Sequence, residues 1–389
     1  MKLTKNCAII IKGMHILYRW NRKTVMDTKI IVIDEENIDK ELLEEAGQII
    51  KAGGLVAFPT ETVYGLGGDA LNPKSSEKIY TAKGRPSDNP LIVHIADFDD
   101  INLIVDKVTD DAKKLADKFW PGPLTMILNK SDKVPYETTG GLDTVAIRMP
   151  VHKTAAEFIR AAGGYVAAPS ANISGRPSPT CAKYVIQDMN GRIDMIIDGG
   201  DAGIGLESTI VDLSGEVPML LRPGFITIEQ LRETLGRVDV DRTILDGDCK
   251  DRPKAPGMKY RHYAPKGDLT IVEAAEEGNG TTGIMSFADS QERVVACIRQ
   301  LTEKASAEGK TVGVISTDET EHLYNADSVK SIGSRGDEAM IAHRLYTILR
   351  EFDDENIEVI YSESFDRGGM GQAIMNRLLK AAGHQIIKV

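Results

Sequence analysis

Hydrophobic and polar residues alternate along the first 240 residues in a way that predicts helices interleaved with short strands. Between Asn37 and Gly53, apolar residues recur every three or four positions and two glycines follow, which is typical of an amphipathic helix and its end. The apolar run from Leu55 to Pro59 then predicts a buried strand. The same criteria predict further helices over 73–83, 109–120, 152–162, 179–189 and 227–235, and further strands over 91–96, 124–128, 144–149, 165–168, 193–197, 208–213 and 219–221.

The spacing of these strands predicts a mixed sheet, because several follow one another too closely for a helix to cross between them. From 241 to 267 the periodicity fails and Pro, Gly, Lys and Tyr are frequent, as in a linker. Strand and helix patterns then alternate from 268 to 389, which predicts a smaller parallel-sheet, Rossmann-like domain. We therefore expect an α/β protein with a mixed-sheet domain over 27–240, an interdomain linker and a second α/β domain.

Length and composition fit this division. A chain of 389 residues exceeds the usual size of one hydrophobic core. The formal net charge of -11 disfavours a surface that holds nucleic acid by general electrostatic attraction. Four widely separated cysteines argue against a zinc knuckle or a disulfide framework and fit a reducing compartment. No apolar run is long enough to span a bilayer. We expect a cytoplasmic protein in which residues 1–26 are an N-terminal extension without the features of a secretory signal.

The segment PTETVYGLGGDA, residues 59–70, places hydroxyls and small residues after a predicted strand, where open α/β sheets bind ligands. Gly65, Gly67 and Ala70 match the spacing of a dinucleotide-binding fingerprint. The glycines come several residues after the strand, however, so the pattern does not predict a nicotinamide site. The sequence contains neither a Walker A pattern nor a GxSxG elbow. Its seven histidines show no metal-binding spacing, and His94, inside an apolar strand, is by default a hydrogen-bonded core residue.

Cations near other strand ends are further candidates. Lys83 and Arg85 lie two residues apart on a Gly-Pro loop, where they suit a polyphosphate, although a solvated loop with two unrelated cations fits the residue types equally well. Arg148 closes a predicted strand and could bind a carboxylate through two hydrogen bonds. Other polar residues also lie beside predicted strands, but taken singly they indicate no more than an ordinary turn. They are Ser170, Asn172, Ser208 and Arg222.

Eight segments of the first domain carry a family resemblance: PTETVYGLG, KGRPSDNPLIVH, WPGPLT, GLDTVAIRMP, APSANISGRPSPT, IIDGG, ESTIVDL and LLRPG. In this order and at these spacings, over about residues 28–236, they closely resemble the YrdC-type threonylcarbamoyl-AMP synthases. Two later segments resemble the linker and the C-terminal domain of the long, two-domain form of that family. They are APGMKYRHYAP and DRGGMGQAIMNRLLKAAG. A mild departure is the loop ISGRPSP, which places Ser174 two residues after Asn172.

The resemblance implies that L-threonine, bicarbonate or carbon dioxide, and ATP react to give threonylcarbamoyl-AMP and pyrophosphate. It implies that the product serves tRNA modification beside the anticodon, handed to a tRNA threonylcarbamoyl transferase complex. The matching motifs imply catalytic roles for Lys83 and Arg85. They imply ATP contacts from Lys83, Arg85, Asn89, Thr144, Ser170, Asn172, Ser178, Arg222 and Tyr263, and threonine contacts from Thr62, His94, Arg148, Ala168 and Ser208.

The chemistry of this reaction agrees with those residue types. The carbamate carboxylate and the α-phosphate of ATP are both anionic, so the site must neutralise their repulsion. Lys83, Arg85, Arg222 and Mg²⁺ are the available charges, and no protein metal site is predicted. Selection of threonine over serine and valine needs a hydroxyl partner and a methyl-sized wall. No residue is an obvious base for the threonine amine.

Some alternatives stay open at this level. Linker residues 259–263 could form a lid that shields an unstable acyl-adenylate from water, or could be part of a plain tether. The alternative function is an RNA-binding module without catalytic activity, which the negative net charge of the protein disfavours. Direct binding of tRNA is left open. A carbamoyl-transfer enzyme of hydrogenase maturation contains a related domain, but it should carry paired-cysteine zinc motifs that this sequence lacks.

Overall fold

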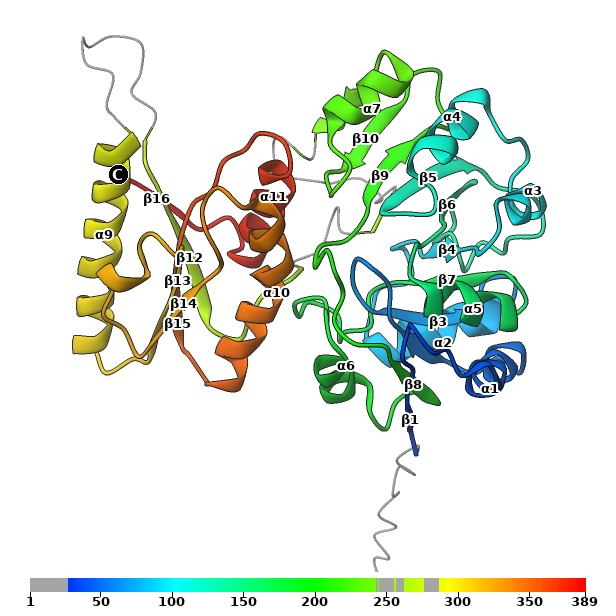
Figure 1. Ribbon diagram of the computed structural model, residues 1–389, viewed down its shortest axis with the longest axis horizontal. Helices are drawn as coiled ribbons and strands as arrows, with labels where there is room; N and C mark the ends of the chain where they lie inside the picture. The colour runs from blue at the N-terminus through cyan, green and yellow to red at the C-terminus, as the bar shows by residue number, and fades with distance from the viewer. Residues whose placement is uncertain (1–26, 243, 245–254, 257–261, 276–286) are drawn as a thin grey trace, which may run out of the picture.

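The computed structural model describes residues 27–242, 244, 255–256, 262–275 and 287–389. The described residues form two sheets, one of 11 strands and one of five. In Figure 1 the larger sheet lies in the blue-to-green half of the chain and the smaller one in the yellow-to-red half. We call the parts built on them the first domain and the second domain. Predicted lid residues Lys259, Tyr260 and Arg261 lie outside the described residues.

The first domain is built on a mixed sheet, which confirms the predicted fold class. Its strand order is β1-β8-β2-β3-β7-β4-β6-β5-β9-β10-β11. It contains both parallel pairs, such as β4 with β6, and antiparallel pairs, such as β5 with β6. The strands are β1 (Lys29–Val32), β2 (Val56–Phe58), β3 (Gly65–Asp69), β4 (Ile92–His94), β5 (Leu124–Asn129), β6 (Thr144–Arg148), β7 (Val166–Ala168), β8 (Met195–Asp198), β9 (Thr209–Asp212), β10 (Met219–Arg222) and β11 (Asp239–Val240).

Six of the seven helices described in this domain lie at predicted positions, and the short α3 (Ile101–Ile104) was not predicted. They are α1 (Lys40–Lys51), α2 (Pro73–Lys83), α3 (Ile101–Ile104), α4 (Asp110–Phe119), α5 (Lys153–Ala161), α6 (Ala182–Met189) and α7 (Ile228–Leu235), with a short 3₁₀ turn at Phe98–Asp100. The bounds of α2 follow from local chemistry: Asn72 caps its first turn, a proline opens it, and Gly84 ends it in the left-handed conformation with φ 63°. This end places Lys83 in the last turn of α2, next to the sheet.

Strand β3 is an element that the hydrophobic pattern did not predict, because its sequence is GLGGD. It pairs antiparallel with both β2 and β7. A Cβ on Gly67 would lie 2.8 Å from Val166 Cγ1 and 3.1 Å from the Val56 carbonyl oxygen, so only glycine fits between the neighbouring strands. These glycines therefore serve strand packing and do not form a strand-to-helix turn, which agrees with the exclusion of a nicotinamide site.

The second domain has an entirely parallel sheet in the order β14-β13-β15-β12-β16, as the regular alternation predicted. The pattern missed β14, a polar edge strand. The strands are β12 (Asp268–Glu273), β13 (Val312–Ser316), β14 (Ser328–Ser331), β15 (Val359–Glu363) and β16 (Ile386–Lys388). The helices are α9 (Phe287–Ala307), α10 (Glu338–Asp354) and α11 (Gly371–Ala381), with a 3₁₀ turn at Glu321–Leu323. Within the described residues, no helix combines the length and apolarity needed to cross a membrane.

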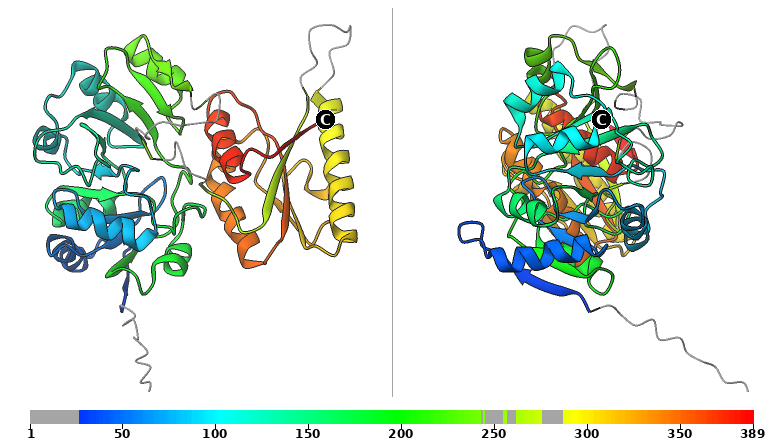
Figure 2. Two further views of the ribbon diagram at one scale, coloured as in Figure 1. Left: turned by 180° about the vertical axis from the view of Figure 1, so that it is seen from behind. Right: turned by 90° about the vertical axis from the view of Figure 1, so that its right-hand side faces the viewer.

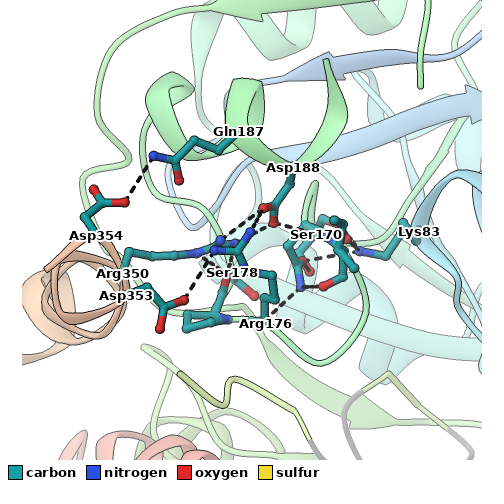
Figure 3. A network of polar contacts seen from close by, with 12 residues as sticks. Lys83, Ser170, Arg176, Ser178, Gln187, Asp188, Arg350, Asp353 and Asp354 are labelled. Atoms are coloured by element: carbon teal, nitrogen blue, oxygen red, sulfur yellow. Dashed lines mark hydrogen bonds and ion pairs between the residues drawn. The ribbon is translucent and has the colours of Figure 1, made fainter. Parts of the chain in front are cut away.

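Helices α10 and α11 face the first domain, whereas α9 covers the opposite face of the small sheet (Figures 1 and 2). Val63, Leu206 and Tyr263 pack into the same buried cluster as the apolar side chains of α10 and α11. Polar contacts accompany this apolar contact, and Figure 3 shows Arg350 of α10 reaching Asp188 of α6. The face of the second domain that contacts the first domain is therefore a buried interface.

Candidate active site

A cavity of about 690 Å³, including the open space at its mouth, lies in the first domain beside the second. Strands β3, β4, β6, β7 and β10 contribute residues to its wall, and the linker residues His262 and Tyr263 border it. The structure brings most of the predicted site residues to this one cavity. They are Thr62, Lys83, Arg85, His94, Arg148, Ala168, Ser170, Asn172, Ser178, Ser208, Arg222 and Tyr263.

Asn89 and Thr144 are the predicted site residues that do not line the cavity. Asn89 is buried, and its carbonyl oxygen accepts a hydrogen bond from Arg85 Nε at 3.4 Å, so it supports a residue that does line it. Thr144 begins β6, at the opposite end of that strand from Arg148. Their contacts with ATP stay predictions.

Lys83 is almost fully buried, with 2% of its surface exposed. Its ammonium group donates to the carbonyl oxygens of Ser170 and Asn172, both at 2.5 Å, and to Asn172 Oδ1 at 3.3 Å. Burial, and next the charge of Arg85, lower the pKa of Lys83 well below its usual value. Lys83 thus connects α2 to the loop after β7 and brings a cation to the cavity wall.

Arg85 and Arg222 are also bound to neutral groups. Arg85 donates to the carbonyl oxygens of Asn89 and Pro90. Burial lowers its pKa to about 10, so it remains protonated at neutral pH. Arg222 donates to the Ser208 carbonyl oxygen from Nε and Nη2, at 3.0 and 2.9 Å. None of the three cations Lys83, Arg85 and Arg222 forms an ion pair with a carboxylate of the described residues.

Arg148 differs because it already has an anionic partner. Its Nη2 lies 2.7 Å from Glu61 Oε1, and its Nη1 donates to Thr62 Oγ1 at 2.6 Å. A substrate carboxylate would have to share this guanidinium with Glu61. The cavity therefore contains two kinds of cation, one that a carboxylate neutralises and one that only dipoles solvate.

His94 is a neutral member of the site. Its Nδ1 lies 3.0 Å from the Ile92 carbonyl oxygen, which can only accept, so Nδ1 carries the proton and Nε2 is the acceptor. Burial, and next the charge of Arg148, lower the pKa of His94 to about 3. The ring packs edge-on against Phe58 at 5.8 Å between centroids. His94 is thus suited to accept a hydrogen bond from a substrate hydroxyl, and it is a weak base.

The hydroxyl groups of the cavity are held by short side-chain contacts. Ser170 Oγ donates to Asn172 Oδ1 at 2.5 Å, and Ser208 Oγ lies 2.7 Å from Thr125 Oγ1. Asp188 fixes the same loop from behind by accepting from the Ile173 amide and from Arg176. Figure 3 shows this arrangement, with Lys83 approaching the loop from the other side. Side-chain hydrogen bonds within the protein therefore orient the hydroxyl groups of these loops.

Tyr263 has a backbone φ of 67°, in the left-handed region that non-glycine residues seldom adopt. Its buried ring stacks on Tyr346 of α10 at 5.2 Å and 30°. The adjacent His262 is buried as well, and this burial lowers its pKa to about 3. In the described part of the predicted lid, the linker thus forms a buried wall of the cavity that is packed against the second domain.

Sequence reasoning missed Glu207, which comes directly before the predicted Ser208 and lines the cavity. Among the described lining residues it is the one carboxylate. Arg377 and Tyr346 of the second domain bind it, and neither was predicted. Arg377 occupies the apolar stripe of α11 with Ile374, Leu378 and Ala381, and an arginine at such a position was the available signal.

Most of the chain matches proteins of several organisms. The threonylcarbamoyl-AMP synthase of Pyrococcus abyssi is 44% identical over 92% of this chain and 99% of its own length. That of Bacillus subtilis is 45% identical over 92% of this chain and 97% of its own. A putative threonylcarbamoyl-AMP synthase of Mycobacterium tuberculosis is 36% identical and matches 52% of this chain. In shape, the chain matches the crystal structure of P. abyssi Sua5 complexed with L-threonine with a TM-score of 0.84 and 44% identity, over 93% of this chain and 100% of that one.

Two family models cover most of the chain. The Sua5, YciO and YrdC model, described as "Telomere recombination", matches residues 48–224. The model described as "Threonylcarbamoyl-AMP synthase, C-terminal domain" matches residues 226–383. Both parts of the long form are thus present, in the order that the resemblance implied. The chain belongs to the threonylcarbamoyl-AMP synthase family, in its two-domain form.

Proposed function

We propose that this protein makes threonylcarbamoyl-AMP from L-threonine, bicarbonate or carbon dioxide, and ATP, and releases pyrophosphate. One observation carries the proposal: Lys83, Arg85 and Arg222 line a single cavity, and only neutral groups of the described residues bind them. Cations that are desolvated without a counter-ion favour an anionic ligand strongly. The names of the relatives support the choice of ATP and threonine.

The reaction needs those charges at one place. The threonine amine, once deprotonated, adds to carbon dioxide and forms a carbamate. A carbamate oxygen then attacks the α-phosphorus of ATP, and the bond to the β-phosphate oxygen breaks to release pyrophosphate. Both reactants are anions, so Lys83, Arg85 and Arg222 reduce their repulsion and stabilise the charge on the leaving group.

The neighbouring polar groups suit threonine. Thr62 is oriented by Arg148, whose guanidinium is turned toward both Thr62 and Glu61. The neutral His94 offers an acceptor for the threonine hydroxyl, and the methyl group of Ala168 supplies a small apolar wall. A hydroxyl partner together with such a wall separates threonine from both valine and serine.

Mg²⁺ would reach this site with ATP. Among the described residues no cluster of three or more His, Cys, Asp or Glu side chains could hold a metal ion. The Glu207 carboxylate at the cavity already accepts three side-chain hydrogen bonds. The donor set therefore fits Mg²⁺ bound mainly by phosphate oxygens and water, as is usual for this ion, and not a resident metal centre.

The product is an acyl-adenylate, which water hydrolyses. The buried wall formed by His262 and Tyr263 limits access of water to the cavity. The protein would pass the product to a tRNA threonylcarbamoyl transferase complex in the cytoplasm. No surface contact with tRNA is part of the proposal.

The test is pyrophosphate release from ATP and Mg²⁺ with threonine and bicarbonate omitted one at a time. Full release should require both co-substrates, and threonylcarbamoyl-AMP should appear in equal amount by mass spectrometry. Release that continues without threonine or without bicarbonate would contradict the proposed reaction. The same assay is applied to Lys83→Met, which removes a cation of the cavity. Its matched control is Lys78→Met, because Lys78 lies on the same helix α2 but binds the Gly53 carbonyl oxygen outside the cavity.

A further inference from the structure

The carboxylate of Glu207 lines the cavity but is held from the second domain. Arg377 Nε donates to Glu207 Oε2 at 3.0 Å, and the Tyr346 hydroxyl donates to the same oxygen at 2.9 Å. Ser178, a predicted ATP contact, donates to Oε1 at 2.6 Å. A carboxylate that would otherwise be an unpaired anion at the cavity wall is therefore satisfied by two residues of α10 and α11 and one of the first domain.

Arg377 is placed for this contact by its own helix. Its side chain is fully buried, and the apolar residues Ile374, Leu378 and Ala381 surround it on the buried face of α11. Its guanidinium also lies 6.0 Å from the centroid of the Tyr263 ring. A buried arginine is costly unless a carboxylate neutralises it, so Arg377 and Glu207 each need the other.

Arg222 is the competing cation. It donates to the carbonyl oxygen of Ser208, the residue next to Glu207, and its Nη2 also reaches Ser208 Oγ at 3.2 Å. Burial, the largest single effect, raises the pKa of Glu207, but the charges of Arg377 and then of Arg222, together with hydrogen bonds from Ser178 and Arg377, outweigh it and lower this pKa to about 2. Glu207 is thus a permanent anion near Arg222, and an anion without Arg377 would attract that cation.

We propose that Arg377 is a positioning residue for the reaction at this cavity: it holds the Glu207 carboxylate to the second domain and so leaves the Arg222 charge available to the anionic substrate. The inference rests on the proposed function, because it takes ATP as the anion. It gives the second domain an electrostatic role in the active site in addition to any mechanical one. Glu207 itself, with its low pKa, is unsuited to act as a general base.

A second interdomain ion pair provides a comparison. Arg350 of α10 donates to both carboxylate oxygens of Asp188, and both side chains are fully buried. Asp188, unlike Glu207, does not line the cavity. The two pairs therefore join the same domains with similar burial, but only Glu207 lines the cavity, whereas Asp188 binds Arg176 and the Ile173 amide behind the cavity loop.

The experiment measures ATP binding by calorimetry, and the Michaelis constants for ATP and threonine, in Arg377→Met and in Arg377→Met/Glu207→Gln. Arg377→Met should weaken ATP binding about tenfold or more, and its KM should rise more for ATP than for threonine. Neutralising Glu207 in the double variant should restore ATP binding to within about threefold of the wild type, since one charge decides the effect. Normal ATP binding by Arg377→Met, or an unrescued double variant, would overturn the proposal.

Arg350→Met and Arg350→Met/Asp188→Asn are the matched controls. Both pairs of variants remove one interdomain arginine and then neutralise its partner, so thermal unfolding should respond similarly. Rescue of ATP binding should occur only in the Arg377 pair. The same rescue in the Arg350 pair would show that any relief of interface strain restores binding, and would contradict the specific role of Arg377.

Tyr346→Phe covers the case in which Arg377→Met does not fold. It removes only the hydroxyl that binds Glu207, and ATP binding should weaken about two- to fivefold, again with rescue by Glu207→Gln. Unchanged ATP binding in Tyr346→Phe would count against the proposal. Inorganic triphosphate serves as a second probe: if the wild type binds it in an Arg377-dependent manner but makes no threonylcarbamoyl-AMP, the proposed function fails and the positioning role stands.

Discussion

Lys83, Arg85 and Arg222, three buried cations of the cavity, differ from the cations of the domain interface in what binds them. Lys83 and Arg222 donate to carbonyl and hydroxyl oxygens, so their charge is solvated but not cancelled. Arg350 and Arg377 donate to carboxylates of the other domain, so their charge is cancelled. Among these residues the partner, and not the burial, therefore separates a cation whose charge is left for an anion from one that holds the two domains together.

The difference has an energetic consequence. A buried ion pair approximately balances desolvation against attraction, and loss of one partner leaves an uncompensated charge. A cation bound only by dipoles bears its desolvation cost until an anion arrives, so the cavity should gain stability when it is filled. The predictions below test this contrast.

Arg350→Met should give the largest loss of stability, because it removes the fully buried partner of Asp188, leaves that carboxylate with only the partly exposed Arg176, and removes two donors to the Pro177 carbonyl oxygen. We expect the free energy of unfolding to fall by about 3–5 kcal/mol. Urea denaturation followed by circular dichroism measures the change, and Asp188→Asn in the same chain should recover part of it. A loss below about 1 kcal/mol would mean that this ion pair does not hold the domains together.

Lys83→Met should affect activity more than stability. Removal of a cation that we propose to stabilise the phosphate charge should lower kcat/KM about 100- to 1000-fold. The stability loss should stay smaller than for Arg350→Met, since no carboxylate loses its partner. Steady-state pyrophosphate release measures the first effect and urea denaturation the second, with Lys78→Met as the control. A large loss of stability with little loss of activity in Lys83→Met would contradict the proposed difference between the two kinds of cation.

Anions should stabilise the protein through the cavity. ATP at 100 times its dissociation constant should raise the free energy of unfolding by about 2.7 kcal/mol. Thermal shift assays should show the gain in the wild type and a much smaller gain in Arg222→Met at the same ATP concentration. Equal gains in both would place the binding site elsewhere.

Acid should weaken the fold through His94. The folded protein holds the pKa of His94 at about 3, against 6.5 when the residue is unperturbed, so between these values the unfolded chain binds a proton that the folded chain does not. The stability that the neutral His94 contributes is fully present above pH 6.5. Below that pH, the free energy of unfolding falls by about 1.4 kcal/mol per pH unit. In His94→Gln, the free energy of unfolding measured with urea should depend less steeply on pH between pH 6.5 and 5. An unchanged slope would contradict a neutral buried His94.

The fold and most of the cavity were predictable from sequence, for different reasons. Helix α2 follows from local signals at Asn72 and Gly84, which act within a few residues. Strand β3 did not, because glycine packing between strands depends on distant neighbours such as Val166. Lys83, Arg85 and Ser170 were identified through motifs, but the hydrogen bonds that each forms were not predicted. The pairing of Glu207 with Arg377 joins residues 170 positions apart, which no local pattern encodes.

The most direct test of the account is a crystal structure of the protein with ATP and threonine bound. We expect the phosphate oxygens within hydrogen-bonding distance of Lys83, Arg85 and Arg222, and Glu207 still bound to Arg377. Phosphates bound away from these three cations, or a Glu207 carboxylate turned onto Arg222, would contradict it.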